Sequence, residues 1–137
     1  MVDKISRDRR SENMRRIRSM GTKPEMVVRR LVHRMGYRYR LHRKDLPGKP
    51  DLVFGPRRKV ILVHGCFWHQ HDHPECKIAR APKSRLEYWQ PKLERNVARD
   101  RANREALELN GWQVLEVWEC QIRDTEALEA RIRDFLG

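Results

Sequence analysis

Residues 51–64 read DLVFGPRRKVILVH, and this stretch decides the fold. Its first four residues predict a short apolar strand that Asp51 opens, directly after Pro50. Gly55 and Pro56 then favour a turn. Residues 59–64 follow, and the unbroken apolar run within them is typical of a strand covered on both faces. The segment therefore predicts two consecutive strands, the second of which other elements cover on both faces.

Residues on either side of this segment supply those elements. Upstream, Thr22 can cap a helix, with Glu25 three positions later as a capping box requires, and Gly36 ends that helix. Alternating tyrosines and arginines at residues 37–41 predict a half-buried strand. Downstream, we expect a short helix at 84–90 that ends before Pro91, a helix at 92–110, a strand at 112–118, and a last helix capped by Asp124 or Thr125. This order predicts an α/β fold with a mixed sheet flanked by helices.

The length of 137 residues is consistent with one domain. Residues 1–20 are polar and basic, and we expect them to form an arm or a marginal helix beside a single domain at 21–137. Residues 65–83 are rich in His, Cys and Pro and have no period, so we expect an irregular loop that a metal holds in place.

The net charge is +12, from 31 Lys and Arg against 19 Asp and Glu. Such a field concentrates polyanions, which favours nucleic acid over the alternatives of acidic lipid or a merely soluble basic protein. No apolar run approaches the roughly 18 residues of a membrane span. The N-terminus has no apolar signal region, so we expect a cytoplasmic protein without a membrane partner.

The three cysteines are odd in number, which argues against a disulfide framework in a cytosolic protein. They are either buried thiols or metal ligands. Cys66, His71 and Cys76 lie close in sequence, and Cys120 comes just after a predicted strand. Together they would complete a closed tetrahedral zinc site of the structural type. Two alternative ligands, His69 and His73, stay open.

A second set of residues has the chemistry of phosphodiester hydrolysis. Asp51 stands at a strand end, where it could bind a hard cation such as Mg²⁺. His64 ends the neighbouring strand and His69 follows it, and a histidine can act as a base near neutral pH. The alternatives are a turn residue for Asp51, and a surface histidine or zinc ligand for His64 and His69.

Two adjacent aromatics, Phe67 and Trp68, stand in this polar segment. They are either core residues or a wedge that enters the base stack of DNA, and Trp89 could join them.

The motifs together resemble the Vsr family, the very-short-patch mismatch repair endonucleases. The resemblance covers nearly the whole chain, and its most specific parts are the Gly-Cys-Phe-Trp-His run and a distant Trp-Glu-Cys. The matching segments are residues 7–17, 47–54, 63–71, 87–89, 96–101, 111–115 and 117–120, together with Lys92.

The resemblance implies a restriction-endonuclease-like core and an Mg²⁺-dependent, strand-specific nick on the 5′ side of the thymine in a T·G mismatch. Such mismatches arise when 5-methylcytosine deaminates. It also implies that the protein is a monomer, that it is associated with the nucleoid, and that it contacts mismatch-repair proteins. The preferred flanking bases and the companion methyltransferase stay open.

The resemblance also implies a role for individual residues. Asp51 binds the catalytic metal together with the backbone carbonyl of Val63. His69 is the general base, His64 assists at the phosphate, and Glu25 and Asp100 act through metal-bound water and positioning. The remaining assignments are structural zinc at Cys66, His71, Cys76 and Cys120, a DNA wedge of Phe67, Trp68 and Trp89, mismatch contacts from Met14, Lys92 and Asn96, and an N-terminal arm in the minor groove.

The chain departs from related patterns in two places. The Glu-x-Lys that usually follows the Pro-Asp of restriction nucleases is replaced by Val63-His64-Gly65. The gap between His71 and Cys76 is long for the Vsr pattern, which keeps His73 open as the zinc ligand. Two other hypotheses also fit parts of the sequence: a zinc-stapled DNA-binding module without chemistry, and a nickase that cuts matched DNA.

Overall fold

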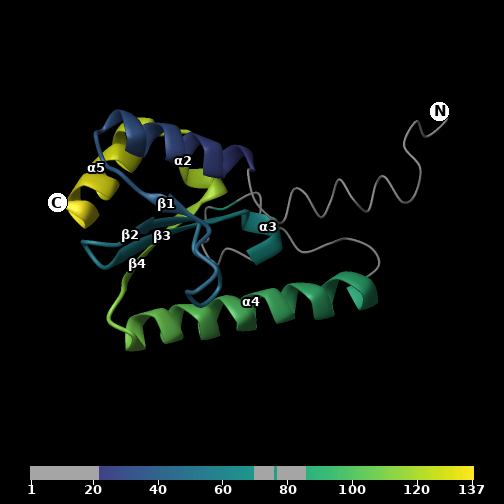
Figure 1. The fold of residues 1–137 in the computed structure, drawn as a ribbon. Helices are drawn as coiled ribbons and strands as arrows, with labels where there is room; N and C mark the ends of the chain where they lie inside the picture. Colours follow the sequence, from purple (N-terminus) through teal and green to yellow (C-terminus); the bar gives the residue numbers. More distant parts are fainter. Residues whose placement is uncertain (1–21, 70–75, 77–85) are drawn as a thin grey trace.

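A four-stranded mixed sheet lies at the centre of this computed structural model, which describes residues 22–69, 76 and 86–137 (Figure 1). The strands are β1 (Arg40–Leu41), β2 (Leu52–Phe54), β3 (Lys59–His64) and β4 (Gln113–Trp118), in that spatial order. The first two pairings are antiparallel, and β3 pairs with β4 in parallel. The predicted α/β fold with a mixed sheet is thus confirmed. The predicted arm at 1–20 lies outside the described residues.

Helices cover both faces of the sheet. Helices α2 (Lys23–Arg34) and α5 (Thr125–Leu136) lie on one face, and α4 (Leu86–Leu109) lies on the other (Figure 1). Helix α4 also connects the parallel strands β3 and β4, as a crossover between such strands requires. A short helix α3 (Cys66–His69) follows β3, and a 3₁₀ turn η1 (Glu119–Gln121) follows β4.

Two hydrophobic clusters hold these layers together, because successive strand residues point to opposite faces. Leu52, Phe54 and Ile61 pack with the apolar residues of α2 and α5. Val53 and Val60 point the other way and pack with Leu107 of α4 and with Trp112. Residues Val60, Ile61 and Leu62 of β3 are all buried, which confirms that this strand is covered on both faces.

The helix caps follow the predicted pattern. Thr22 Oγ1 accepts a hydrogen bond from the backbone N–H of Glu25 at 3.4 Å, and Asp124 Oδ1 accepts one from Ala127 at 3.1 Å. The Glu25 carboxylate, expected to point back to the cap, contacts His42 instead.

Three predictions about local structure were wrong in part or in full. The strand expected at residues 37–41 is shorter, because only Arg40 and Leu41 pair with β2. Helix α4 continues through Pro91 as one helix, although we expected a break there. The proline removes one backbone hydrogen bond, to the carbonyl of Glu87, and Glu87 is exposed, so water can take that carbonyl. The expected irregular loop from residue 65 begins with the helical turn α3, in which the N–H of His69 donates to Gly65 O at 3.1 Å.

Helix α4 offers a matched test of the core beneath the sheet. Leu107 is fully buried, whereas Leu109 on the same helix is 88% exposed. We expect Leu107→Ala to lower the free energy of unfolding by about 2–5 kcal/mol, because it leaves a cavity against Val53 and Val60. Leu109→Ala should change it by less than about 0.5 kcal/mol. Urea denaturation measures both, and equal losses would contradict this packing.

Candidate active site

The antiparallel pairing of β2 and β3 brings Asp51 beside the end of β3. Asp51 stands directly before β2, and Leu52 pairs with Ile61, so the residue before Leu52 lies beside the last residues of β3. The backbone N–H of Val63 donates to Asp51 Oδ2 at 2.7 Å. Asp51 and the backbone of Val63, both predicted to bind the catalytic metal, are therefore in direct contact.

Two further side chains join Asp51 from different elements. Glu25, in the first turn of α2, is 2% exposed, and its Oε1 lies 3.1 Å from His42 Nε2. The same nitrogen lies 3.7 Å from Asp51 Oδ1. One ligand atom from each of Glu25, His42 and Asp51 lies within 4.8 Å of the others. The oxygens suit a hard divalent cation such as Mg²⁺.

Burial changes the acidity of Asp51. Loss of solvent around the carboxyl group, together with the neighbouring Glu25, raises its pKa to about 8, although the hydrogen bond from Val63 acts in the opposite direction. The carboxyl group is therefore protonated near neutral pH in the protein without a cation. A divalent cation that binds there must displace this proton.

A second group lies where β3, α3 and α4 meet. His64, the last residue of β3, is 6% exposed, and its ring centroid lies 4.4 Å from that of His69 at the end of α3. His69 Nδ1 contacts Asp100 Oδ2 on α4 in a short hydrogen bond. When the Nδ1–H of a neutral imidazole donates to a carboxylate, Nε2 is left as an acceptor. This pair has the form of an oriented general base.

Both groups open onto one cleft of about 700 Å³. Asp51, Val63, His64, His69 and Asp100 all line it. Glu25 reaches it indirectly, through His42. The five predicted residues that line the cleft are spread over 49 positions of the sequence, from Asp51 to Asp100.

Five further polar residues line the cleft and were not identified as site residues by the sequence analysis: His42, Lys44, Lys49, Arg99 and Asn103. A signal was present for some of them. On α4, Asn96, Asp100 and Asn103 recur at helical spacing between the buried Leu93 and Leu107, so polar residues that are buried or half-buried occupy this face, with the exposed Arg99 beside them. The role of His42 required the pairing of β1 with β2, which the sequence pattern alone does not give.

At one wall of the cleft, the backbone of Gly48 lies very close to helix α4. Gly48 has a φ of +74°, and a Cβ atom there would lie 2.7 Å from Asn103 Nδ2 on α4. Only glycine occupies such a position without strain or displacement. The loop that precedes Asp51 therefore lies directly against α4.

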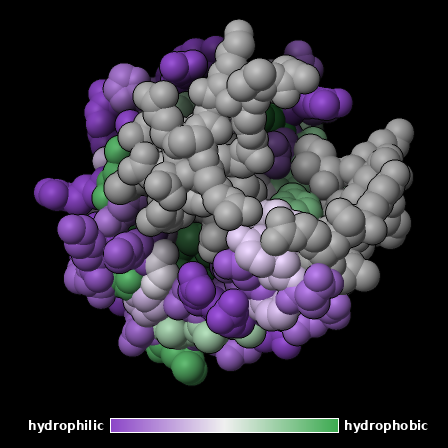
Figure 2. Space-filling model, turned by 90° about the vertical axis from the view of Figure 1, so that its right-hand side faces the viewer, coloured by the Kyte–Doolittle hydropathy of each residue, from purple (hydrophilic) through white to green (hydrophobic). Residues whose placement is uncertain are grey.

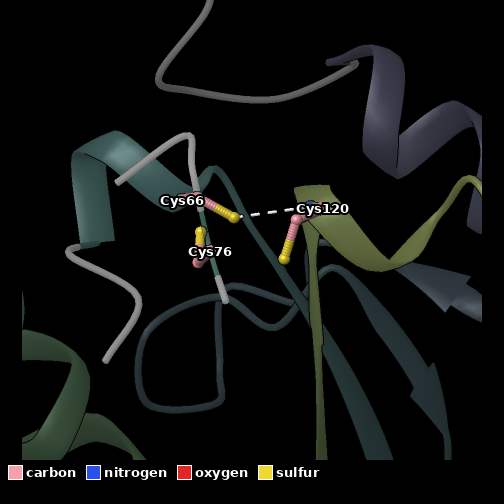
Figure 3. Close-up of side chains that lie close together, drawn as sticks. All are labelled: Cys66, Cys76 and Cys120. Carbon is pink, nitrogen blue, oxygen red and sulfur yellow. Dashed lines mark hydrogen bonds between the residues drawn. The ribbon is translucent and has the colours of Figure 1, made fainter. Parts of the chain in front are cut away.

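The three cysteines lie close together where α3 begins and where the chain leaves β4 (Figure 3). Because β3 and β4 are parallel with His64 opposite Trp118, Cys66 and Cys120 follow the two strands at equal distance. The N–H of Cys120 donates to Cys66 Sγ at 3.4 Å, and the N–H of Cys66 donates to Glu119 Oε1 at 3.3 Å. Cys76 completes the group.

The cysteine group has the chemistry of a zinc site. The three sulfur atoms lie within 4.8 Å of one another, and tetrahedral Zn–S bonds of about 2.3 Å place sulfurs roughly 3.8 Å apart. Burial raises the pKa of the Cys66 thiol to about 12, so without a cation it is a neutral thiol. The proposed fourth ligand, His71, and its alternative His73 lie outside the described residues.

The predicted DNA-contacting residues are described in part. Phe67 of α3 meets Trp89 of α4 edge to face, with ring centroids 5.6 Å apart. Lys92 Nζ lies 4.9 Å from the centroid of the Tyr88 ring, and Asn96 is 8% exposed. The side chain of Trp68 and the whole of Met14 lie outside the described part.

The described surface at the α3 end of the molecule is mostly hydrophilic (Figure 2). The cleft itself is lined by three basic side chains, Lys44, Lys49 and Arg99. Among the described residues, none of the helices is long and apolar enough to cross a bilayer.

Known proteins resemble this chain along most of its length. The family model for the DNA mismatch endonuclease Vsr matches residues 2–75. The type II nicking enzyme V.XorIIP of Xanthomonas oryzae pv. oryzae is 54% identical over 136 residues, which cover 99% of this chain and 98% of that protein. The DNA mismatch endonuclease Vsr of Escherichia coli is 41% identical over 128 residues, covering 93% and 80%. The type II nicking enzyme V.NmeAIP of Neisseria meningitidis is 37% identical over 132 residues, covering 96% and 92%.

The cleft contains an acidic residue at a strand end and a histidine–carboxylate pair. These residues are consistent with a nuclease, which is also what the family model and the relatives indicate. The chain belongs to the Vsr family of DNA mismatch endonucleases and is an endonuclease that acts on DNA.

Proposed function

We propose that this endonuclease nicks one strand of duplex DNA on the 5′ side of the thymine in a T·G mismatch, with Mg²⁺ as its catalytic cation. The mismatch would come from deamination of 5-methylcytosine, and the nick would start very-short-patch repair. The observation that carries the proposal is that Asp51 and the His69–Asp100 pair line the same cleft. Hydrolysis of a phosphodiester needs a cation site and a base within reach of one phosphate.

In this proposal Asp51 and the backbone of Val63 hold Mg²⁺, and Glu25 acts beside them. Bound there, the cation stabilises the negative charge that develops on the phosphate. We further propose that the sheet is of the restriction-endonuclease-like type, since its acidic residue stands directly after Pro50 at the start of β2.

His69 is proposed to take the proton of the attacking water. Its Nδ1 contacts Asp100, so Nε2 remains to accept a proton, and the carboxylate stabilises the imidazolium that forms. His64, buried against His69 and 4.8 Å from the Trp118 ring centroid, is proposed to act at the phosphate. Lys44, Lys49 and Arg99 would balance the charge of the DNA backbone near the cleft.

Mismatch recognition is proposed to come from the aromatics beside the cleft. Phe67 and Trp89 are in contact although they belong to different helices, so these two rings can act as one unit. Trp68 is proposed to join them in the wedge. Opening a base stack costs less at a mispair than at a Watson–Crick pair, which would make a wedge selective. Met14, Lys92 and Asn96 would contact the mispair, and the arm at 1–20 would lie in the minor groove.

Zinc at Cys66, Cys76, Cys120 and His71, with His73 as the alternative, is proposed to hold α3 against the end of β4. His69 and Phe67 belong to α3, so this staple would aim both the base and the wedge. We further propose that the protein acts as a monomer in the cytoplasm, at the nucleoid, and that mismatch-repair proteins are its partners.

The substrate is tested with two duplexes that differ at one position, T·G or C·G, in the presence of Mg²⁺, with both strands resolved. We expect one nick, in the thymine strand of the T·G duplex. Equal nicking of both duplexes would contradict mismatch specificity. Asp51→Asn should lower the rate by at least about a hundredfold because it removes a charged oxygen ligand, whereas Asp134→Asn, on the exposed part of α5, should leave it unchanged.

The His69–Asp100 pair is tested by a double-mutant cycle under single-turnover conditions. His69→Gln and Asp100→Asn should each lower the nicking rate by about a hundredfold or more. The double variant should be little slower than the slower single variant, because the two residues act as one unit. DNA affinity, measured by fluorescence anisotropy, should change little. Fully additive losses would show that Asp100 does not act through His69.

The zinc site is tested by elemental analysis of active protein. We expect about one zinc ion per chain, and Cys120→Ser should lose it together with nicking, because three remaining ligands bind zinc far more weakly. Asp51→Asn is the matched control and should keep its zinc while losing activity. If active protein contained far less than one zinc ion per chain, a structural zinc site would be ruled out.

A further inference from the structure

We propose that His42 is a protein ligand of the catalytic cation, through Nε2, and that it shifts the preference of the site from Mg²⁺ toward Mn²⁺. This inference rests on the proposed cation site at Asp51. The geometry carries it, because the imidazole nitrogen lies between two carboxylates, 3.1 Å from Glu25 Oε1 and 3.7 Å from Asp51 Oδ1.

The position of His42 follows from the sheet. Leu41 pairs with Leu52, so in the antiparallel register the next residue, His42, lies opposite Asp51. The backbone N–H of His42 donates to Asp51 O at 3.3 Å, which extends the ladder by one step. Side chains of directly opposed residues in such a ladder are neighbours. His42 is thus tied to Asp51 through both the backbone and the side chain.

The backbone of His42 is also unusual. Its φ is 46°, in the left-handed region that residues other than glycine seldom adopt. Such conformations persist where the surrounding structure holds them, and they concentrate at functional sites. Here the strained residue leaves β1 with its side chain lining the cleft, 21% exposed, beside a carboxylate that is 2% exposed.

The three groups make a mixed donor set. Two carboxylates and one imidazole, from α2, the end of β1 and the start of β2, offer ligand atoms within 4.8 Å of one another. Mg²⁺ prefers oxygen donors, whereas imidazole nitrogen suits transition ions. A site made of Asp51 and backbone carbonyl alone would favour Mg²⁺, and a nitrogen donor added to it should raise the affinity for Mn²⁺ more than that for Mg²⁺.

The alternative is that His42 only orients Glu25 by a hydrogen bond. The two roles differ in a spectroscopic property that does not depend on catalysis. If His42 binds the cation, Mn²⁺ added to the zinc-replete protein without DNA shows hyperfine coupling to a histidine nitrogen in pulsed EPR. If His42 only orients Glu25, the bound Mn²⁺ shows oxygen donors alone.

The experiment compares wild type with the His42→Gln variant. The matched control is His33→Gln, because His33 is an exposed histidine of α2. We expect nitrogen coupling in wild type and in His33→Gln and its loss in His42→Gln. The affinity for Mn²⁺ in His42→Gln should fall by about tenfold or more, and that for Mg²⁺, measured by competition, should fall much less. An unchanged melting temperature without added Mn²⁺ or Mg²⁺ shows that the variant folds.

Several outcomes overturn the proposal: no Mn²⁺ binding to wild type, coupling that persists in His42→Gln, or an unchanged ratio of the two affinities. If the variant fails to fold, wild type labelled with ¹⁵N-histidine still decides whether any histidine binds. Protein that nicks the T·G duplex but shows no nitrogen coupling keeps the proposed function and loses the His42 ligand. Protein that shows the nitrogen coupling but does not nick the T·G duplex keeps the His42 ligand and loses the proposed function.

Discussion

The burial of β3 on both faces is the constraint on which the rest of the structure depends. A strand that is apolar on both sides must be covered by helices above and below, and it needs a strand on each edge. The parallel neighbour β4 requires a crossover, which is α4. Once these elements are in place, the end of β3 becomes the point from which the cleft, the α3 turn and the cysteine group all extend.

This arrangement separates the chemistry into adjacent groups with different environments. The Glu25–His42–Asp51 group lies where β1 and β2 meet α2, and burial raises the pKa of the Asp51 carboxyl group. The His69–Asp100 pair is partly exposed and hydrogen-bonded, as the proposed exchange of protons with water would require. The cysteine group lies where α3 begins, so cations of different character would be kept apart by ligand type: sulfur in one group, oxygen and nitrogen in the other.

Much of this could be predicted from the sequence because the signals are local. The apolar run of β3, the Thr22 and Asp124 caps and the alternation around Tyr39 each depend on a few neighbouring residues. Short motifs also led to the predicted roles of Asp51 and His69, and the structure places both residues at one cleft, while the roles themselves stay predictions. What could not be predicted depends on tertiary structure. The role of His42 follows from strand register, and the continuation of α4 through Pro91 follows from where solvent reaches its first turns.

The contact of Gly48 with Asn103 has a consequence for how this cleft can change over evolution. The loop of residues 46–50 and helix α4 both line the cleft, and where Gly48 meets Asn103 they lie so close together that a Cβ atom on residue 48 has no room. A side chain at position 48 would collide with the Asn103 side chain and would also be strained by the positive φ of this residue. Position 48 is therefore restricted to glycine for two reasons, whereas a smaller residue at position 103 could be accommodated without a change at position 48.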